Sequence, residues 1–159
     1  MYTLIKELYV RWNQKSCYSI LILGPESAGK TTFLEKVKCT YSNTYIFSTN
    51  NVIPTVGQNI GRVTVGKTKI QLWDLGGRPS LRSLWGIPIL ILANKQDLDG
   101  SIAIEEIKMV FNNVTEKLKE CKSHIIPASA INGTGVQEAI EWLKNQMEQN
   151  TSIRKPIYY

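Results

Sequence analysis

The pattern of apolar and polar positions predicts short strands that alternate with helices. Residues 20–23 and 87–93 are short apolar runs, which are typical of strands buried in a sheet. Residues 58–65 and 68–73 alternate apolar and polar positions and meet at Gly66, as the two strands of a hairpin do.

Apolar residues at helical spacing predict three helices. One helix follows Thr32, a second starts after Ser101 as its N-cap, and a third starts at about Val136. A short strand at residues 125–126 separates the last two. The side chains expected in the core are Phe33, Leu34 and Val37 of the first helix, Ile104, Ile107, Val110, Phe111 and Val114 of the second, and Val136, Ala139, Ile140, Leu143 and Met147 of the third. This alternation predicts an α/β fold with a mostly parallel sheet.

Length and composition fit one compact domain. The 159 residues are 43% hydrophobic and 20% charged, as in ordinary globular proteins. The net charge of +6 comes from basic residues that are scattered along the chain, so we expect no nucleic-acid partner. The three cysteines lie far apart without Cys-x-x-Cys spacing, which favours reduced thiols in the cytosol. No apolar run reaches the length of a transmembrane helix.

Residues 1–15 have the pattern of an amphipathic helix, with Tyr9 and Trp12 on its apolar face. Such a helix can lie in a membrane interface or pack on its own domain, and the sequence leaves both open. Tyr2 stands where N-myristoylation needs glycine, and the chain ends in Tyr159 without a cysteine for prenylation. Membrane contact through residues 1–15 is therefore expected to be reversible.

A glycine-rich loop of the form G-x-x-x-x-G-K-[ST] follows the strand at residues 20–23. Its two glycines let backbone N–H groups point at phosphate oxygens, and the helix that follows adds positive potential. Lys30 would meet the β- and γ-phosphates, and the Thr31 hydroxyl would bind Mg²⁺. A chance glycine turn is the weaker explanation, because both the strand and the helix are in place. The residues expected around the phosphates are Gly24, Glu26, Ser27, Ala28, Gly29, Lys30, Thr31 and Thr32.

The sequence Asn-Lys-Gln-Asp at residues 94–97 indicates which base is bound. The Asp97 carboxylate can accept two hydrogen bonds side by side, and guanine N1–H and N2–H₂ offer two such donors, whereas adenine does not. Asn94 can brace the loops around the base, and Lys95 can lay its aliphatic stem along the ring. Ser129 and Ala130 follow the next strand, where backbone N–H groups could reach guanine O6.

Thr55, Asp74 and Gly77 are candidate sensors of the γ-phosphate. The Thr55 hydroxyl could complete the Mg²⁺ shell when the third phosphate is present, the Gly77 N–H could bond that phosphate, and Asp74 could hold Mg²⁺ through water. Thr55 can also be explained as a turn residue after Pro54, but the whole motif set occurs in order. The metal ligands expected on the protein are therefore Thr31 and Thr55.

In this order the motifs resemble those of the small GTPases, and above all the ADP-ribosylation factor family with its ADP-ribosylation-factor-related branch. The resemblance is carried by residues 24–32, 53–57, 73–77, 84–85, 93–98 and 129–130. It implies a Ras-like P-loop fold of three layers, with a shortened G domain at residues 16–149 between the helix of residues 1–15 and a tail at residues 150–159.

The same resemblance implies GTP and GDP with Mg²⁺ as cofactors, and exchange factors, activating proteins and effectors as partners. It implies a monomer that lies peripherally on the cytoplasmic side of the Golgi or trans-Golgi network. The expected function is a GTP-binding switch in vesicle-mediated protein transport.

Two departures from the family pattern change these expectations. Arg78 stands where the family has the glutamine that orients the attacking water, and guanidinium has no acceptor, so slow GTP hydrolysis is expected. Only nine residues separate Gly77 from Ile87, where the family has a further strand and helix. Either residues 87–93 move beside residues 20–23 to close the sheet, or no stable fold forms.

Three functions follow from these alternatives. The first is a guanine-nucleotide switch with impaired hydrolysis. The second is a truncated form that occupies membrane or partner sites without switching, and tight GDP binding would separate the two. The third is a P-loop kinase that uses ATP; Asp97 and the absence of a lid for a nucleoside acceptor argue against it.

Overall fold

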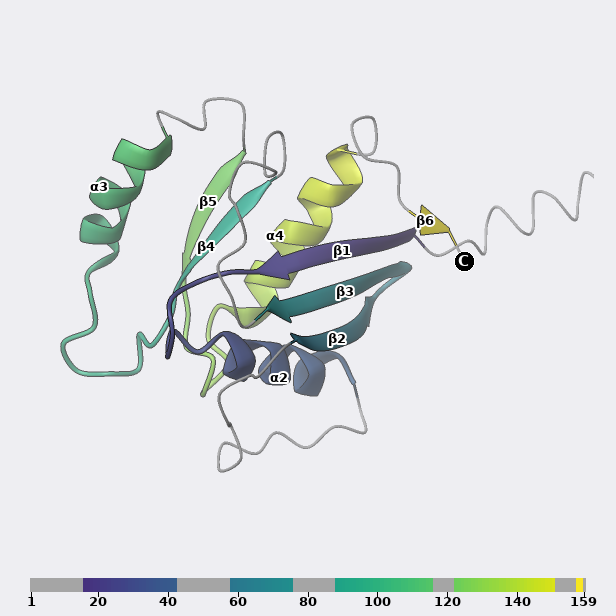
Figure 1. The fold of residues 1–159 in the computed structure, drawn as a ribbon, viewed down its shortest axis with the longest axis horizontal. Coiled ribbons are helices and arrows are strands. Elements are labelled where there is room, and N and C mark those ends of the chain that lie inside the picture. Colours follow the sequence, from purple (N-terminus) through teal and green to yellow (C-terminus); the bar gives the residue numbers. More distant parts are fainter. Residues whose placement is uncertain (1–15, 43–57, 76–87, 116–121, 151–156, 159) are drawn as a thin grey trace, which may run out of the picture.

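The computed structural model describes residues 16–42, 58–75, 88–115, 122–150 and 157–158 (Figure 1). Its elements in chain order are β1 (Ser16–Ile22), α2 (Lys30–Tyr41), β2 (Gln58–Val65), β3 (Thr68–Leu75), β4 (Ile89–Ala93), α3 (Ile104–Thr115), β5 (Ser123–Pro127), α4 (Val136–Gln149) and β6 (Ile157–Tyr158). Strands and helices alternate as the sequence predicts.

Four strands form the larger sheet, in the order β2-β3-β1-β6. β1 and β3 are parallel, and their register places Ile22 opposite Asp74. β2 and β3 form the antiparallel hairpin expected around Gly66. β6 lies within the segment expected to be a tail and pairs antiparallel with the first two residues of β1, Ser16 and Cys17.

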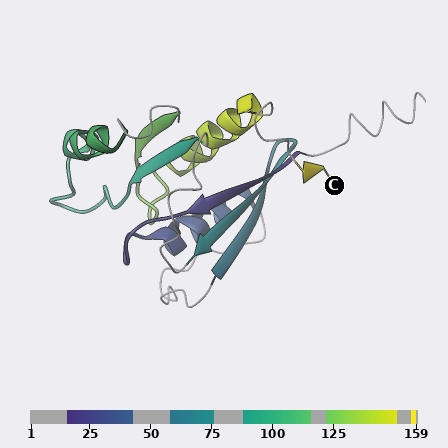
Figure 2. The ribbon, with the colours of Figure 1, turned by 45° about the horizontal axis from the view of Figure 1, so that its top comes forward.

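β4 and β5 form a separate parallel sheet of two strands (Figures 1 and 2). The expectation that the strand of residues 87–93 would close up against β1 is therefore wrong. β4 keeps its ladder with β5, from Ile89 opposite Ser123 to Ala93 opposite Pro127, and it keeps its contacts with α4. These interactions hold β4 beside β5, so β4 does not pair with β1.

The core lies between the strands and the helices α2 and α4. Its buried side chains are Phe33, Leu34, Val37, Val63, Ile70, Leu72, Ile126, Ala130, Val136, Ala139 and Ile140. α2 packs so closely on β2 that a Cβ at Gly61 would lie 2.5 Å from Leu34 Cδ1. Leu143 and Met147 of α4, expected in the core, are only half-buried.

The opposite face of the strands is less covered than the sequence predicts. Leu21 of β1 is 38% exposed, and the strand at residues 89–93 is half-buried except for Ala93. α3 stands apart from both sheets (Figures 1 and 2), and its Val110, expected in the core, is 68% exposed. An apolar run shows which side chains can be buried, but they are buried only where another layer of the fold covers them. The described elements supply such a layer on one face of the strands.

The start of α3 also differs from its prediction. The first helical bonds run from the N–H groups of Glu106 and Ile107 to the carbonyl of Ala103, so Ser101 does not cap the helix. The Ser101 hydroxyl instead lies 3.4 Å from Gln96 Oε1. Among the described helices, none is long and apolar enough to cross a membrane.

Candidate nucleotide-binding site

The loop between β1 and α2 has the tight curl that a phosphate cradle needs. Ser27 and Gly29 have left-handed backbones, with φ of 59° and 86°, and α2 begins directly after them at Lys30. The Phe33 N–H donates to the Gly29 carbonyl at 2.8 Å, which joins the loop to the first turn of the helix. A Cβ at Gly29 would collide with the side-chain amide of Asn94, so this position needs glycine for space as well as for φ.

Lys30 arches back over its own loop. Its Nζ donates to the carbonyls of Gly24 at 3.0 Å and Pro25 at 2.8 Å. These are neutral acceptors on the exposed side of the loop, and phosphate oxygens would be stronger ones. The Lys30 ammonium group therefore lies against the loop in which the sequence predicts bound phosphates.

Thr31 and Asp74 meet beside the loop. The Thr31 hydroxyl donates to Asp74 Oδ2 at 2.7 Å, and the Asp74 side chain is fully buried. The parallel register of β1 and β3 causes this meeting, because it places Asp74 level with the end of β1, where the loop begins. A hydroxyl and a carboxylate are hard oxygen donors, which is the set that Mg²⁺ prefers when phosphates supply its other ligands.

Thr31 and Asp74 are suited to a Mg²⁺ ion that is bound together with phosphates, rather than to a metal ion held by protein ligands alone. Within the described residues, no group of three or more His, Cys, Asp or Glu side chains could hold a metal ion by itself. Mg²⁺ in nucleotide sites needs only one or two protein oxygens beside the phosphates. Thr31 can supply such an oxygen directly, and Asp74 lies within hydrogen-bond reach of it.

Asn94 braces the loops, as its place in the motif suggests. It follows β4, its Nδ2 donates to the Ala28 carbonyl at 2.8 Å, and its Oδ1 accepts from the Ala130 N–H at 3.0 Å. One side chain therefore joins the phosphate loop, the end of β4 and the loop after β5. These three segments come from both sheets.

The remaining residues of the Asn-Lys-Gln-Asp motif form an exposed turn. Lys95 has a left-handed backbone with φ of 68°, and its carbonyl accepts the Leu98 N–H at 3.1 Å. The Gln96 N–H donates to the Ala128 carbonyl at 3.1 Å, which fixes the turn against the neighbouring loop. Asp97 lies on the exposed side of this turn, where its carboxylate can meet a base from solvent.

The loop after β5 is more tightly bonded than the sequence suggests. The N–H groups of Ala128, Ser129 and Ala130 donate to Ala93 O, Thr134 O and Asn94 Oδ1, so all three are already used within the protein. A contact of Ala130 N–H with guanine O6 would thus share or exchange its bond with Asn94.

Sequence reasoning missed the residues that shape this loop. The Asn132 N–H donates to Ser129 Oγ, and the Thr134 N–H donates to Asn132 Oδ1. Gly135 has a φ of 73°, and a Cβ there would collide with the Pro127 carbonyl. The signal was present as the Asn-Gly-Thr-Gly run at residues 132–135, which is typical of a turn.

Three predicted residues lie outside the described part of the chain. These are Thr55, Gly77 and Arg78, and the amphipathic segment of residues 1–15 lies outside it too. Their roles stay predictions. The described residues that the fold brings together at one edge of the strands are those of the phosphate loop, Asp74, Asn94 to Asp97, and Ala128 to Ala130.

The sequence of this chain is similar to those of known proteins. The ADP-ribosylation factor family matches residues 2–87 and 86–147 of the chain. ADP-ribosylation factor-like protein 3 of Saccharomyces cerevisiae is 38% identical, over 99% of this chain and 100% of its own length. The human ADP-ribosylation factor-related protein 1 is 36% identical, over 94% of each chain.

The fold is similar to a solved small GTPase. The structure of Arl6 from Trypanosoma brucei, solved with the bound nucleotide analogue GppNp, aligns with a TM-score of 0.66. At 20% identity, over 84% of this chain and 99% of that one, the match shows the shared Ras-like P-loop fold.

The comparisons also locate a shortening of the chain. The alignment with the yeast protein spans 198 positions, more than the 159 residues present here, so that relative carries residues without a counterpart in this chain. The two family matches meet at residues 86–87, directly before β4. The phosphate loop, Asp74, the Asn-Lys-Gln-Asp turn and the loop after β5 are all retained, and the chain belongs to the ADP-ribosylation factor family of small GTPases, which are GTP-binding switches.

Proposed function

We propose that this chain binds GDP and GTP with Mg²⁺ at the edge where β1, β3, β4 and β5 end, and that it hydrolyses GTP slowly. The observation that carries the proposal is the pair of hydrogen bonds made by Asn94, to Ala28 at 2.8 Å and from Ala130 at 3.0 Å. They hold the phosphate and base segments together although β1 and β4 belong to separate sheets.

The residues around the phosphates would bind them through backbone N–H groups and through the positive charge of Lys30. The curled loop offers N–H groups to phosphate oxygens, and Lys30 transfers its bonds from Gly24 and Pro25 to the β- and γ-phosphates. The residues proposed to bind the nucleotide are Gly24, Glu26, Ser27, Ala28, Gly29, Lys30, Thr31, Thr32, Thr55, Asp74, Gly77, Asn94, Lys95, Asp97, Ser129 and Ala130.

Thr31 and Asp74 would hold Mg²⁺ against the phosphates. Their 2.7 Å contact supports this role, because the hydroxyl could turn its lone pairs to the metal while the Asp74 carboxylate accepts a hydrogen bond from that hydroxyl or from a metal-bound water. The metal would neutralise phosphate charge, and Thr55 is the further protein ligand proposed for the GTP form.

Arg78 is the reason to propose slow hydrolysis. A water-positioning residue must accept a hydrogen bond from the attacking water, and guanidinium carries donors only. GTP bound here would then persist longer than in relatives that carry glutamine at this position.

We further propose that the chain acts in Golgi and vesicle-mediated protein transport, as a monomer with exchange factors, activating proteins and effectors as partners. It would lie in the cytoplasm and attach peripherally to the Golgi or trans-Golgi network through residues 1–15. The support is the family resemblance together with the Tyr9 and Trp12 face and the basic face of that segment.

Among the described strands, none joins β1 to β4, and this favours a second candidate function. A chain that lacks this part of the sheet can keep partner-binding surfaces and yet fail to change state between GDP and GTP. Such a chain would occupy membrane or partner sites without switching. Tight and selective GDP binding argues for the switch, and weak or absent binding argues for this alternative.

Thermal unfolding of the full chain with Mg²⁺ and either GDP or ADP tests the proposal. A ligand at 100 times its dissociation constant adds about 2.7 kcal/mol to the free energy of unfolding, which a melting curve resolves. We expect one cooperative transition that GDP raises and ADP does not. Equal effects of GDP and ADP, or none from either, would contradict a guanine site.

A further inference from the structure

β1 and β4 each present a strand edge toward the region between the two sheets. One side of β1 pairs with β3 along its whole length, whereas on the other side β6 covers only Ser16 and Cys17. Among the described strands, none pairs with that other side from Ser19 to Ile22, and β4 pairs with β5 alone. In both views β4 lies on the side of the β4–β5 pair that faces β1 (Figures 1 and 2).

The hydrogen bonds of β4 show which of its backbone groups face this region. The Ile89 N–H donates to Lys122 O, and the Ala93 carbonyl accepts the Ala128 N–H, each at 2.9 Å on the β5 side. Successive residues of a strand point their backbone groups to opposite sides. The N–H and C=O groups of Leu90 and Leu92 therefore point away from β5, toward β1.

The side chains around these edges are apolar and incompletely covered. Ile20, Ile22, Leu90 and Leu92 are half-buried against the core, and Leu21 is 38% exposed. Two rows of backbone donors and acceptors with apolar side chains between them suit an extended strand, which can satisfy both rows at once. A helix would satisfy neither row, because its backbone groups are bonded internally.

The direction of such a strand follows from the two edges. β1 and β4 both lead into the nucleotide site, one into the phosphate loop and the other into Asn94, so they run the same way. The family matches this chain in two pieces that meet at residues 86–87, directly before β4, and the yeast relative carries residues without a counterpart here. The missing chain and the open edges thus occur at the same place in the fold.

We propose that Ser19–Ile22 of β1 and Leu90 and Leu92 of β4, here called the open edge pair, bind an extended apolar strand supplied by another chain. The strand lies parallel to both and joins the two sheets into one. The strand chosen to test the proposal is the stretch present in the yeast relative and absent here. Because the open edge pair leads into both halves of the nucleotide site, the bound strand should also slow GDP release, a part of the inference that rests on the proposed function.

The experiment uses the full chain and a labelled synthetic peptide that spans the stretch of the yeast protein without a counterpart here. Fluorescence anisotropy, without nucleotide, should show saturable binding of one peptide per chain. Leu90→Pro removes an N–H that faces the open side, and an edge strand tolerates proline there. Leu90→Ala is the matched control, because it removes the same side chain and keeps the N–H.

We expect Leu90→Pro to weaken peptide binding at least about tenfold relative to Leu90→Ala, which corresponds to the loss of roughly one good hydrogen bond. Equal affinities for the two variants would overturn the proposal, as would absence of binding to the natural chain. Equal binding of a peptide of the same composition in scrambled order would overturn it too.

A second measurement does not depend on the fold of any variant. The same peptide with N-methyl groups on alternate backbone nitrogens keeps its side chains and loses the donors of one edge. It should bind the natural chain at least about tenfold more weakly. If the natural chain is instead a dimer that Leu90→Pro converts to monomer and Leu90→Ala does not, a second copy fills the edge and the proposal is wrong.

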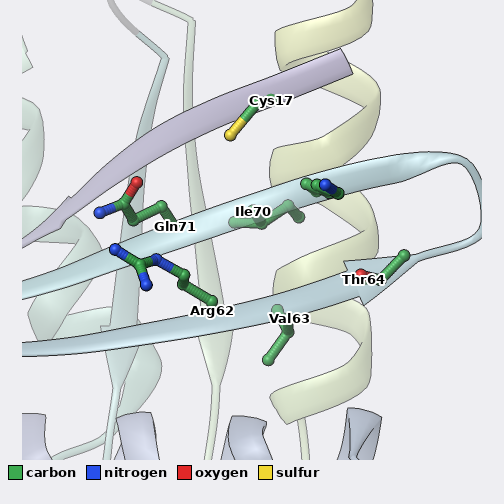
Figure 3. Close-up of a pocket in the computed structure, with 7 residues that line it drawn as sticks. Cys17, Arg62, Val63, Thr64, Ile70 and Gln71 are labelled. Carbon is green, nitrogen blue, oxygen red and sulfur yellow. The ribbon is translucent and has the colours of Figure 1, made fainter. Parts of the chain in front are cut away.

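Strands of the larger sheet also line a hollow. It is lined by Cys17, Arg62, Val63, Thr64, Lys69, Ile70 and Gln71 on the face of β1, β2 and β3 shown in Figure 3. Arg62 and Lys69 make it basic, but no further feature of the described residues there indicates a particular ligand.

Discussion

The side-chain amide of Asn94 donates to the backbone carbonyl of Ala28 at 2.8 Å, and this bond joins the end of β4 to the loop that follows β1. The two strands lie in different sheets, so no ladder of backbone bonds fixes their relative position. The bond crosses at Gly29, whose lack of a Cβ leaves room for the amide. In a continuous sheet, backbone hydrogen bonds would also hold β1 and β4 together. The nucleotide site of this protein therefore depends more strongly on the Asn94 side chain.

Asn94→Ala should weaken GDP binding about tenfold to a hundredfold. The change removes the two hydrogen bonds by which this side chain joins the phosphate loop to Ala130, each with a net contribution of about 0.5–1.5 kcal/mol. Isothermal titration with GDP and Mg²⁺ measures the effect. Gln96→Ala is the control, since Gln96 Nε2 lies 3.4 Å from Ile102 O on the exposed side of the same turn; an equal loss in both variants would contradict the role of Asn94.

Asp97→Asn should change the base that is preferred. The introduced amide can donate to the C2 carbonyl of xanthine and accept its N1–H, but it would face the guanine amino group with a donor. We expect GDP affinity to fall at least about tenfold while xanthosine diphosphate gains, as competition titrations can show. Asp99→Asn, an exposed acid close by, should leave both affinities unchanged.

Thr31→Val should abolish the gain in GDP affinity that Mg²⁺ gives. Valine has the shape of threonine without the hydroxyl that contacts Asp74 at 2.7 Å, so it can neither bind the metal nor satisfy that carboxylate. Thr31→Ser keeps the hydroxyl and should keep the gain. GDP dissociation constants with Mg²⁺ and with a chelator give the ratio for each variant, and a serine variant that behaves as valine does would count against a metal contact here.

Arg78→Gln should raise the rate of GTP hydrolysis at least about tenfold, because the amide oxygen can accept a hydrogen bond from the attacking water. Single-turnover assays with bound GTP measure the rate directly. Arg78→Lys provides the comparison, since lysine also lacks an acceptor. A glutamine variant no faster than the lysine variant would show that residue 78 does not limit hydrolysis.

Gly61→Ala should lower the free energy of unfolding by about 1–3 kcal/mol, because the new methyl group would lie 2.5 Å from Leu34 Cδ1. Leu34→Val removes that terminal carbon and should relieve part of the clash. The two changes together should then cost less than the sum of their separate effects in urea unfolding. Strict additivity would indicate that α2 shifts away from β2 instead.

Most elements could be predicted from the sequence because their cause is local. The hairpin around Gly66 follows from alternation and a glycine turn, and the burial of Phe33, Leu34 and Val37 follows from helical spacing next to a strand. The phosphate loop and the turn at Asn94 were recognisable for a related reason, since each requires glycine or a particular side chain at a fixed spacing.

Pairing between distant strands was not predictable in the same way. Residues 89–93 form a strand within the expected range, but the sequence offered no means to choose between β1 and β5 as its partner, because either could supply backbone donors and acceptors. Val110 shows the same limit for helices. Its helical position is correct, and yet it is exposed because nothing described packs against that side of α3.

The chemistry of this protein is already present in its amino-acid order: the glycines that allow the loop to curl, the lysine and threonine at its end, and the carboxylate suited to guanine. These depend on residue type and on spacing along the chain. Three features became visible in the folded chain alone: Thr31 meets Asp74, Asn94 links two sheets, and β1 and β4 lie in separate sheets. Such contacts join residues remote in sequence, and they depend on how the strands pack, which no local pattern specifies.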